Sequence, residues 1–245
     1  MERSYVVTGG AQGVGRAIVE RLAQDGHVVV LDLHPWTGEH PAVSAVTGDA
    51  ADEAVAARAA DAAERVAPLA GWVNNAAIFR DAALHDTPAA DVLELIGLNL
   101  GLALTGCATA IRRFLAGERP GAIVNVSSHQ AQRAVPGALP YATAKAAIEG
   151  LTRALAVDYG PQGIRTNAVA LGSIATERSD ARPELHDEIA RLHPLGRIGR
   201  PAEVASVVAH LLSADAGFVN GAIVPVDGGR AALGQDPEAR PVVDR

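Results

Sequence analysis

Residues 4–15 read Ser-Tyr-Val-Val-Thr-Gly-Gly-Ala-Gln-Gly-Val-Gly, and an amphipathic helical pattern follows over residues 13–25. A short apolar run that passes through closely spaced glycines into a helix predicts a strand, a tight turn and a helix in succession. Glycine there also lets a pyrophosphate approach the backbone, where the helix N-terminus stabilises its negative charge. The spacing is Thr-Gly-x-x-x-Gly-x-Gly and not the usual Gly-x-Gly-x-x-Gly of a dinucleotide-binding turn.

Short apolar runs alternate with longer amphipathic ones along the rest of the chain. The expected strands are 4–8, 27–31, 42–47, 70–73, 121–126, 164–169 and 222–226. The expected helices are 13–25, 52–66, 88–115 with a break near Gly97, 140–159, 184–192 and 201–213. Continuous apolar strands are typical of a parallel sheet covered on both faces. We therefore expect a single α/β domain, a Rossmann-type doubly wound parallel sheet of about seven strands with helices on both faces.

The composition limits the kinds of partner that the protein is expected to bind and the compartment in which it is expected to work. The chain carries 21 Lys and Arg against 28 Asp and Glu, a formal charge of −7, without a basic cluster, so we expect no nucleic-acid partner. The single cysteine, Cys107, suits a reducing compartment and is expected to pack rather than react. No signal peptide pattern is visible, and the apolar stretch from Leu98 to Ile111 is too short to span a bilayer. These features favour a cytoplasmic protein that does not enter a membrane.

Asp32 ends the second expected strand, in Val30-Leu31-Asp32-Leu33. An acidic side chain at this position accepts hydrogen bonds from the adenosine ribose hydroxyls of a dinucleotide. It would also repel a 2′-phosphate at close range. Asp32 therefore favours NAD over NADP as the cofactor.

Tyr141 and Lys145 are four residues apart in an expected helix and share one of its faces. A free phenol is a poor base at neutral pH, but a fixed ammonium beside it favours the phenolate. The pair thus suits a general acid/base that moves a proton to or from an alcohol oxygen. Ser128, after the buried run 122–126, could hold the same oxygen. The eight histidines show no ligand spacing, so no metal is expected.

The chain resembles the short-chain dehydrogenase/reductase family over about residues 4–229. The resemblance rests on several motifs in order: Thr8-Gly9 to Gly15, Asn74-Asn75-Ala76, Asn99, Ser128, Tyr141-x-x-x-Lys145 and Val226-Asp227-Gly228-Gly229. Two positions depart from the family pattern. Ala77 stands where the family usually has Gly, and Leu171-Gly172 stands where it usually has Pro-Gly.

The resemblance implies a role for each matching residue. Around the cofactor it places Gly9, Gln12, Gly13, Val14, Gly15, Asp32, Leu33, Asp49, Ala50, Asn75, Ala76, Ala77, Ile174 and Thr176, together with Tyr141 and Lys145. Tyr141 would be the acid/base, Lys145 would assist it and hold the nicotinamide ribose, Ser128 would orient the substrate oxygen, and Asn99 would hold a water that links Lys145 to solvent. It also implies a homotetramer or homodimer.

We expect one NAD(P)-binding domain, 1–229, in which the irregular stretch at about 172–200 forms a substrate loop, followed by a polar tail, 230–245. Residues expected to face a small-molecule alcohol or ketone are Ser128, His129, Gln130, Tyr141 and Gly172, with Phe79, Arg80, Gln132, Arg133, Glu177 and Arg178 as further candidates. Their polarity favours a sugar, polyol or hydroxy acid. Two alternatives stay open: an NADPH-dependent reductase of 3-oxoacyl or polyketide-type carbonyls, and a regulator that binds NAD without turnover.

Overall fold

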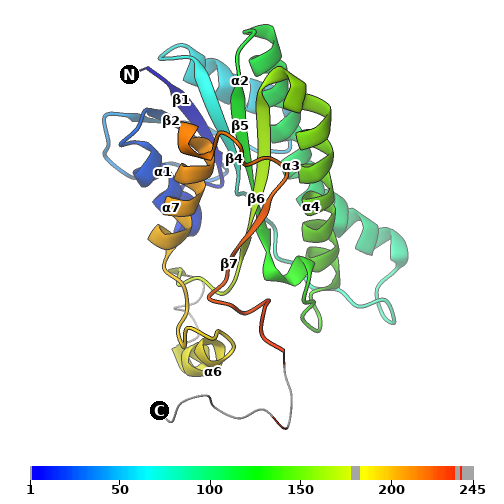
Figure 1. The fold of residues 1–245 in the computed structure, drawn as a ribbon. Coiled ribbons are helices and arrows are strands. Elements are labelled where there is room, and N and C mark those ends of the chain that lie inside the picture. The colour runs from blue at the N-terminus through cyan, green and yellow to red at the C-terminus, as the bar shows by residue number, and fades with distance from the viewer. Residues whose placement is uncertain (1, 178–182, 235–237, 239–245) are drawn as a thin grey trace.

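The protein forms a parallel sheet of seven strands in the order β3-β2-β1-β4-β5-β6-β7 (Figure 1). This computed structural model describes residues 2–177, 183–234 and 238. The strands are β1 Ser4–Thr8, β2 His27–Asp32, β3 Val43–Thr47, β4 Leu69–Asn74, β5 Gly121–Ser128, β6 Ile164–Leu171 and β7 Ile223–Val226. The strand order reverses at β1, between β2 and β4, and such a point opens a crevice beyond the carboxyl ends of the strands.

Helices cover both faces of the sheet, as expected for a doubly wound fold (Figure 1). They are α1 Gly13–Leu22, α2 Glu53–Glu64, α3 Ala89–Ala116, α4 Leu139–Tyr159, α6 His186–Arg191 and α7 Pro201–Leu212, with short 3-10 turns that include η1 His129–Ala131 and η3 Pro183–Leu185. α1 packs on α7 over one face, and α3 packs between α2 and α4 over the other. α6 lies beyond the end of the sheet, away from the N-terminus (Figure 1).

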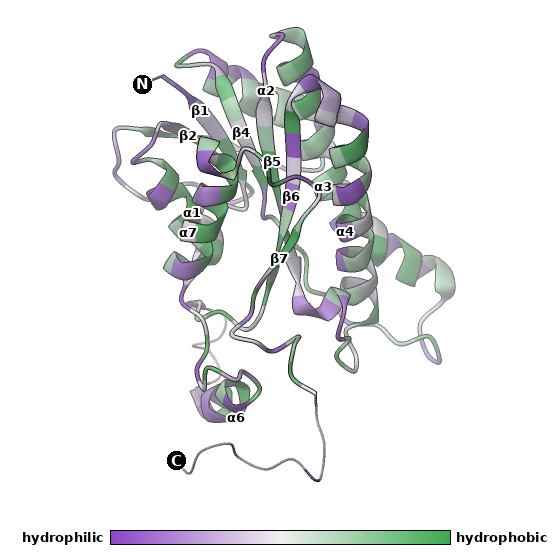
Figure 2. Ribbon diagram, viewed as in Figure 1, coloured by the Kyte–Doolittle hydropathy of each residue, from purple (hydrophilic) through white to green (hydrophobic). Residues whose placement is uncertain are grey.

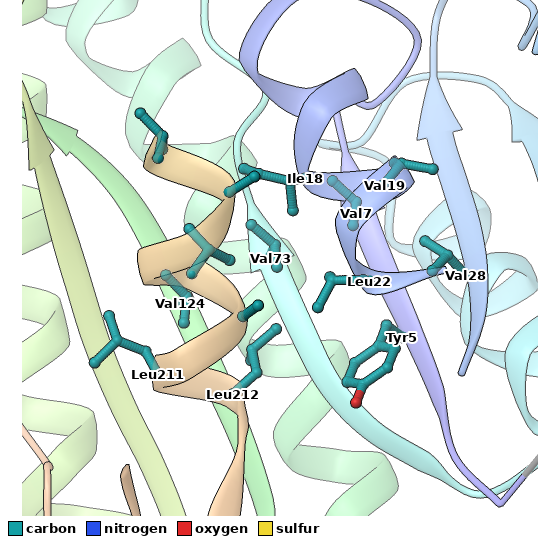
Figure 3. Packing of buried hydrophobic residues seen from close by; sticks show 14 of the residues in the cluster. Tyr5, Val7, Ile18, Val19, Leu22, Val28, Val73, Val124, Leu211 and Leu212 are labelled. Atoms are coloured by element: carbon teal, nitrogen blue, oxygen red, sulfur yellow. The ribbon is translucent and has the colours of Figure 1, made fainter. Parts of the chain in front are cut away.

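Two apolar clusters hold the layers together. In one of them, Ile18 and Leu22 of α1 and Leu211 and Leu212 of α7 belong to one cluster over the central strands, with Leu212 on the side of α7 that faces α1 (Figure 3). The other fills the space beneath α2 and α3 and includes Trp72. Apolar residues accordingly follow the strands and the inner helix faces (Figure 2). Burial of this surface is the main force that fixes the sheet and its carboxyl edge.

The expected break near Gly97 is wrong, because α3 runs without interruption from Ala89 to Ala116. A glycine inside a helix costs only about 1 kcal/mol, and the buried residues on both sides of Gly97, such as Val92 and Leu102, outweigh it. By length and composition α3 could cross a membrane. Its buried face, however, packs against β4, α2 and α4, so it is a core helix of this fold.

The other differences from the expected elements lie at their ends. β5 and β6 each run two residues longer, to Ser128 and Leu171, because the two strands pair over their full lengths. α1 ends at Leu22, and the region expected as helix 184–192 splits into η3 and α6. Of the expected tail, residues 235–237 and 239–245 lie outside the described residues, while residues 230–234 follow the turn after β7.

Candidate active site

The glycine turn after β1 packs closely on itself and on the segment after β4. Gly9 and Gly13 adopt left-handed φ angles of +63° and +55°, which favour glycine. A Cβ on Gly9 would lie 2.8 Å from the Cα of Ala76, and a Cβ on Gly15 would collide with the carbonyl oxygen of Gly9. Gln12 is the N-cap of α1, and no side chain caps the helix. The first turn of α1 therefore presents backbone N–H donors to an anion.

Asp32 ends β2 and is tied to the same turn. Its Oδ2 accepts a hydrogen bond from the backbone N–H of Ala11, and its Oδ1 accepts one from the N–H of His34, both at 2.9 Å. The carboxylate thus holds the glycine turn against the end of β2. This structural role was not expected from the sequence, and it adds to any role in binding a ribose.

The other residues expected near the adenosine lie at the ends of β2 and β3 and in α1. Leu33 is 66% exposed, so it offers apolar surface to a ligand. Asp49 is exposed, Ala50 is buried, and Val14 is half-buried at the start of α1. The fold therefore gathers these segments at one edge of the sheet.

Thr8 and Asn75 join β1 to the segment that follows β4. The hydroxyl oxygen of Thr8 accepts hydrogen bonds from the N–H groups of Asn75 and Ala76 at 3.0 and 3.1 Å. The side-chain amide of Asn75 donates to the carbonyl oxygens of Thr8 and Gly9 at 3.1 and 2.8 Å. Ala77 has no positive φ, so an alanine there causes no backbone strain.

The segment after β6 returns over the glycine turn. A Cβ on Gly13 would lie 3.4 Å from Cγ2 of Thr176. Ile174 forms an isolated parallel bridge with Gly199, which ties together the two ends of the expected substrate loop. Thr176 and Gly13 also line a pocket of about 260 Å³. Two parts of the expected cofactor site that are far apart in sequence are thus adjacent.

Tyr141 and Lys145 lie on one face of α4, as their spacing predicts. The Nζ of Lys145 lies 5.4 Å from the centroid of the Tyr141 ring and donates a hydrogen bond to the carbonyl oxygen of Val126 at 2.6 Å. Lys145 is only 3% exposed, and this burial lowers the pKa of its ammonium to about 8. No carboxylate in the described part of the chain forms an ion pair with it.

Asn99 fixes the loop that approaches Tyr141. Its Oδ1 accepts a hydrogen bond from the N–H of Ile78, and its Nδ2 donates to the carbonyl oxygen of Ile78, both at 2.9 Å. The next residue, Phe79, stacks on Tyr141 with ring centroids 4.9 Å apart. Asn99 is therefore a positioning group for this loop.

Ser128 is the last residue of β5, and its Oγ accepts a hydrogen bond from the N–H of Gln130 at 3.2 Å. The neighbouring Ser127 donates to Oε1 of Glu149 at 3.1 Å, and Gln132 donates to Oε2 of Glu149 at 3.3 Å. Glu149 is 5% exposed and was not expected in the site. The signal that could have found it is its spacing, because it follows Lys145 by four residues on the same helix face.

Two histidines lie behind the strand ends. The Nδ1 of His129 donates to the carbonyl oxygen of Leu171 at 3.1 Å. His193, which was not expected in the site, donates from Nδ1 to the carbonyl oxygen of Ile189 at 2.8 Å and accepts at Nε2 from the N–H of Ser173 at 3.1 Å. Burial is the main cause that lowers the pKa of both imidazoles, so both are neutral at pH 7.

The remaining residues expected to face the substrate are spread around this edge. Gly172 lies so close to His193 that a Cβ on it would be 2.9 Å from the Nε2 of His193. Gln130 is half-buried. Arg80, Gln132, Arg133 and Glu177 are exposed, and Arg178 lies outside the described residues.

Comparison with known proteins identifies the family to which the chain belongs. The family model described as Enoyl-(Acyl carrier protein) reductase matches residues 9–231. The chain belongs to the short-chain dehydrogenase/reductase family. It is therefore an NAD(P)-dependent oxidoreductase that acts on alcohol or ketone groups.

Relatives and solved structures of this family match the whole fold. The 2-(S)-hydroxypropyl-CoM dehydrogenase 3 of Xanthobacter autotrophicus is 35% identical over 93% of this chain and 96% of its own length. The aldohexose dehydrogenase of Thermoplasma acidophilum superposes with a TM-score of 0.88 at 31% identity, covering 98% of this short-chain dehydrogenase/reductase and 97% of its own chain. ElxO with NADP bound superposes with a TM-score of 0.86 at 25% identity, over 95% and 100%.

Proposed function

We propose that the protein transfers a hydride between NAD(H) and a secondary alcohol or ketone, in a small polar substrate such as a sugar, polyol or hydroxy acid. The observation that carries this proposal is the buried ammonium of Lys145, held 5.4 Å from the ring centroid of Tyr141. Ser128 ends the adjacent strand, and the glycine turn lies at the same edge of the sheet.

The residues present fit a nicotinamide dinucleotide. The left-handed Gly9 and Gly13 and the close contact of Gly15 with Gly9 make the turn tight, and the start of α1, which no side chain caps, suits a pyrophosphate. The residues that would hold the cofactor are Gly9, Gln12, Gly13, Val14, Gly15, Asp32, Leu33, Asp49, Ala50, Asn75, Ala76, Ala77, Tyr141, Lys145, Ile174 and Thr176. When bound, the nicotinamide supplies the site that accepts or gives the hydride.

Four side chains of this chain would serve the reaction. Tyr141 takes the proton of the substrate hydroxyl in oxidation and returns it in reduction, while Ser128 holds the same oxygen. The ammonium of Lys145 favours the ionised form of a phenol beside it. Asn99 holds the loop of Ile78 in register and would support a water between Lys145 and solvent. His129, Gln130 and Gly172 would border the substrate.

Asp32 supports NAD over NADP, because a 2′-phosphate would approach a carboxylate that the N–H groups of Ala11 and His34 already fix in place. The competing proposal is an NADPH-dependent reductase of 3-oxoacyl or polyketide-type carbonyls. The likeness to ElxO, which holds NADP, favours it. A regulator that binds NAD without turnover is a weaker candidate, since Tyr141, Lys145 and Ser128 are all present.

The proposal includes an oligomeric state and a cellular location for the protein. A cytoplasmic homotetramer or homodimer fits the exposed apolar side chains Leu93, Leu104 and Leu115 on α3 and Val157 on α4, which a partner copy would cover. The domain would span 1–229, with the substrate loop at about 172–200 and the tail at 230–245.

The experiment that tests this function has two parts. Calorimetry on the purified protein would compare NAD⁺ with NADP⁺, for the wild type and for Asp32→Ala. We expect tighter binding of NAD⁺ and a weaker preference in the variant. Tighter binding of NADP⁺ by the wild type would favour the carbonyl reductase. Formation of NADH with a panel of secondary alcohols then separates an enzyme from a regulator, which would bind NAD⁺ without turnover.

A further inference from the structure

A second pocket, of about 330 Å³, is lined by His129, the residue after Ser128, and is rich in arginine. Its described lining residues are His129, Arg133, Ala134, Val135, Arg191, Leu192, Arg230 and Leu233. Three of these eight carry a guanidinium group, and none of them is acidic. A pocket of this size suits a small molecule.

The pocket is assembled from three segments that are far apart in sequence. His129 and Arg133 follow β5 and Ser128, Arg191 ends α6, and Arg230 follows β7. The first of these segments leads directly into α4, which carries Tyr141. A substrate whose hydroxyl lay between Ser128 and Tyr141 could therefore extend toward this pocket.

The three arginines of this pocket form no ion pair with a described carboxylate. Among the described residues, no carboxylate oxygen lies within 4.0 Å of a guanidinium nitrogen of Arg133, Arg191 or Arg230, whereas Arg16, Arg21, Arg112, Arg113, Arg119, Arg197 and Arg200 all form ion pairs. Asp227 accepts hydrogen bonds from the backbone N–H groups of Gly229 and Ala231, and it interacts with Arg230 only through space, without an ion pair within 4.0 Å. Guanidinium groups that form no ion pair with a carboxylate can bind an anion.

His129 gives a second, independent sign of a ligand. It is only 5% exposed, and its Nδ1 donates a hydrogen bond to the carbonyl oxygen of Leu171. Its Nε2, however, has no hydrogen-bond partner in the described structure. A buried polar atom without a partner is uncommon in native proteins and calls for a ligand or a water. Because Nδ1 carries the proton, Nε2 is an acceptor, which suits a hydroxyl group of the same ligand.

We propose that Arg133, Arg191 and Arg230 bind an anionic group of the substrate, so that the enzyme acts on a hydroxy or oxo acid rather than on a neutral sugar or polyol. This inference rests on the proposed function and narrows its substrate class. The shared chemistry is a carboxylate, sulfonate or phosphate held by charge-assisted hydrogen bonds, with the reacting carbinol carbon a few bonds away.

The test compares anionic alcohols with a neutral counterpart. Initial rates of NADH formation would be measured for 3-hydroxybutanoate, 2-hydroxypropane-1-sulfonate and glycerol 3-phosphate, and for the neutral 3-hydroxybutanamide. We expect at least one anion to exceed the amide in kcat/KM by about tenfold or more. The anion that reacts best tells a carboxylate site from a sulfonate or phosphate site.

Variants of the pocket arginines test whether the preference for anionic alcohols comes from this pocket. Arg133→Gln and Arg191→Gln should each reduce the ratio of anion to amide in kcat/KM by about tenfold, chiefly through KM. These two are preferred to Arg230→Gln, because Arg230 also donates a hydrogen bond to Ser173 at 2.8 Å. Arg112→Gln is the matched control, since Arg112 pairs with Glu53 on the far side of α3 from α4 and should leave the ratio unchanged.

Binding separates failure of the inference from failure of the proposed function. If no alcohol reduces NAD⁺, the proposed function fails, and calorimetry with the same three anions still tests the pocket. Binding that weakens about tenfold in both pocket variants, but not in Arg112→Gln, would support the anion site. Equal kcat/KM for the amide and all three anions, or anion binding that is the same in wild type and both pocket variants, would overturn it.

Discussion

The ring of Phe79 lies stacked on the ring of Tyr141, with centroids 4.9 Å apart and planes inclined by 29°. Phe79 belongs to the loop after β4, which Asn99 holds through its two hydrogen bonds to Ile78. The proposed acid/base is therefore positioned from two sides, by its own helix and by the loop after β4, the strand that pairs with β5. This arrangement gives a first prediction.

Phe79→Ala should lower kcat by about two- to tenfold, because a stacked aromatic pair contributes about 0.5–1.5 kcal/mol beyond its buried area. Phe79 is 53% exposed, so the free energy of unfolding should change little. Steady-state kinetics and urea unfolding would be measured on the same preparation, with Phe79→Tyr as the control that keeps the stack. A large loss of stability with unchanged kcat would show that the stack serves the fold and not the site.

Lys145→Met should abolish most turnover and yet stabilise the protein without cofactor at pH 7. Burial lowers the pKa of Lys145 from 10.5 to about 8, so at pH 7 the folded protein carries a desolvated charge. Its removal should raise the free energy of unfolding by about 1–3 kcal/mol, after allowance for the lost hydrogen bond to Val126. Denaturant unfolding of both proteins would measure this difference.

The lowered pKa of Lys145 also determines how the free energy of unfolding changes with pH. Between about pH 8 and 10.5 the unfolded chain keeps a proton on Lys145 that the folded protein releases. The stability of the wild type should therefore rise with pH in this window relative to that of Lys145→Met. A difference that stays constant from pH 7 to 10.5 would contradict the buried charged ammonium.

Gly15→Ala and Gly97→Ala should have opposite effects. A Cβ on Gly15 would collide with the carbonyl oxygen of Gly9, whereas a Cβ on Gly97 meets no atom within 4 Å. Gly15→Ala should thus lower both the melting temperature and the affinity for NAD⁺. Gly97→Ala should stabilise α3 by about 0.5–1 kcal/mol and leave binding unchanged. Thermal unfolding and calorimetry check both, and stabilisation by Gly15→Ala would be inconsistent with the tight turn.

Glu149→Leu should destabilise the turn after Ser128, because it removes the acceptor of the Gln132 amide and the nearer acceptor of the Ser127 hydroxyl, which then reaches only the carbonyl oxygen of Lys145 at 3.5 Å. A loss of about 1–3 kcal/mol is expected for a buried hydrogen-bonded group. Glu149→Gln keeps one acceptor oxygen and should recover part of both stability and kcat. Equal kcat in wild type and both variants would show that the hydrogen bonds of Glu149 to Ser127 and Gln132 do not affect the proposed active site.

The sequence predicted the parts of this protein that depend on local pattern. The glycine turn at 9–15 and the spacing of Tyr141 and Lys145 follow from neighbouring residues on one turn or one helix face, and the apolar runs predicted every strand. The expected break at Gly97 failed, since burial along both sides of the helix outweighs one glycine. The contacts Asn99–Ile78, Phe79–Tyr141 and Glu149–Ser127 join segments that only the tertiary fold brings together. The arginine pocket draws on three such segments, so no window of sequence could show it.

The central claim is that Tyr141 moves the proton of the substrate alcohol while the cofactor site stays independent of its hydroxyl. The most direct measurement is the turnover of Tyr141→Phe, with NAD⁺ binding followed by calorimetry on the same sample. Turnover should fall by about 10²–10⁴-fold, the usual contribution of general acid/base catalysis, while the affinity for NAD⁺ stays within a few-fold of the wild type. Turnover close to that of the wild type would contradict the assignment.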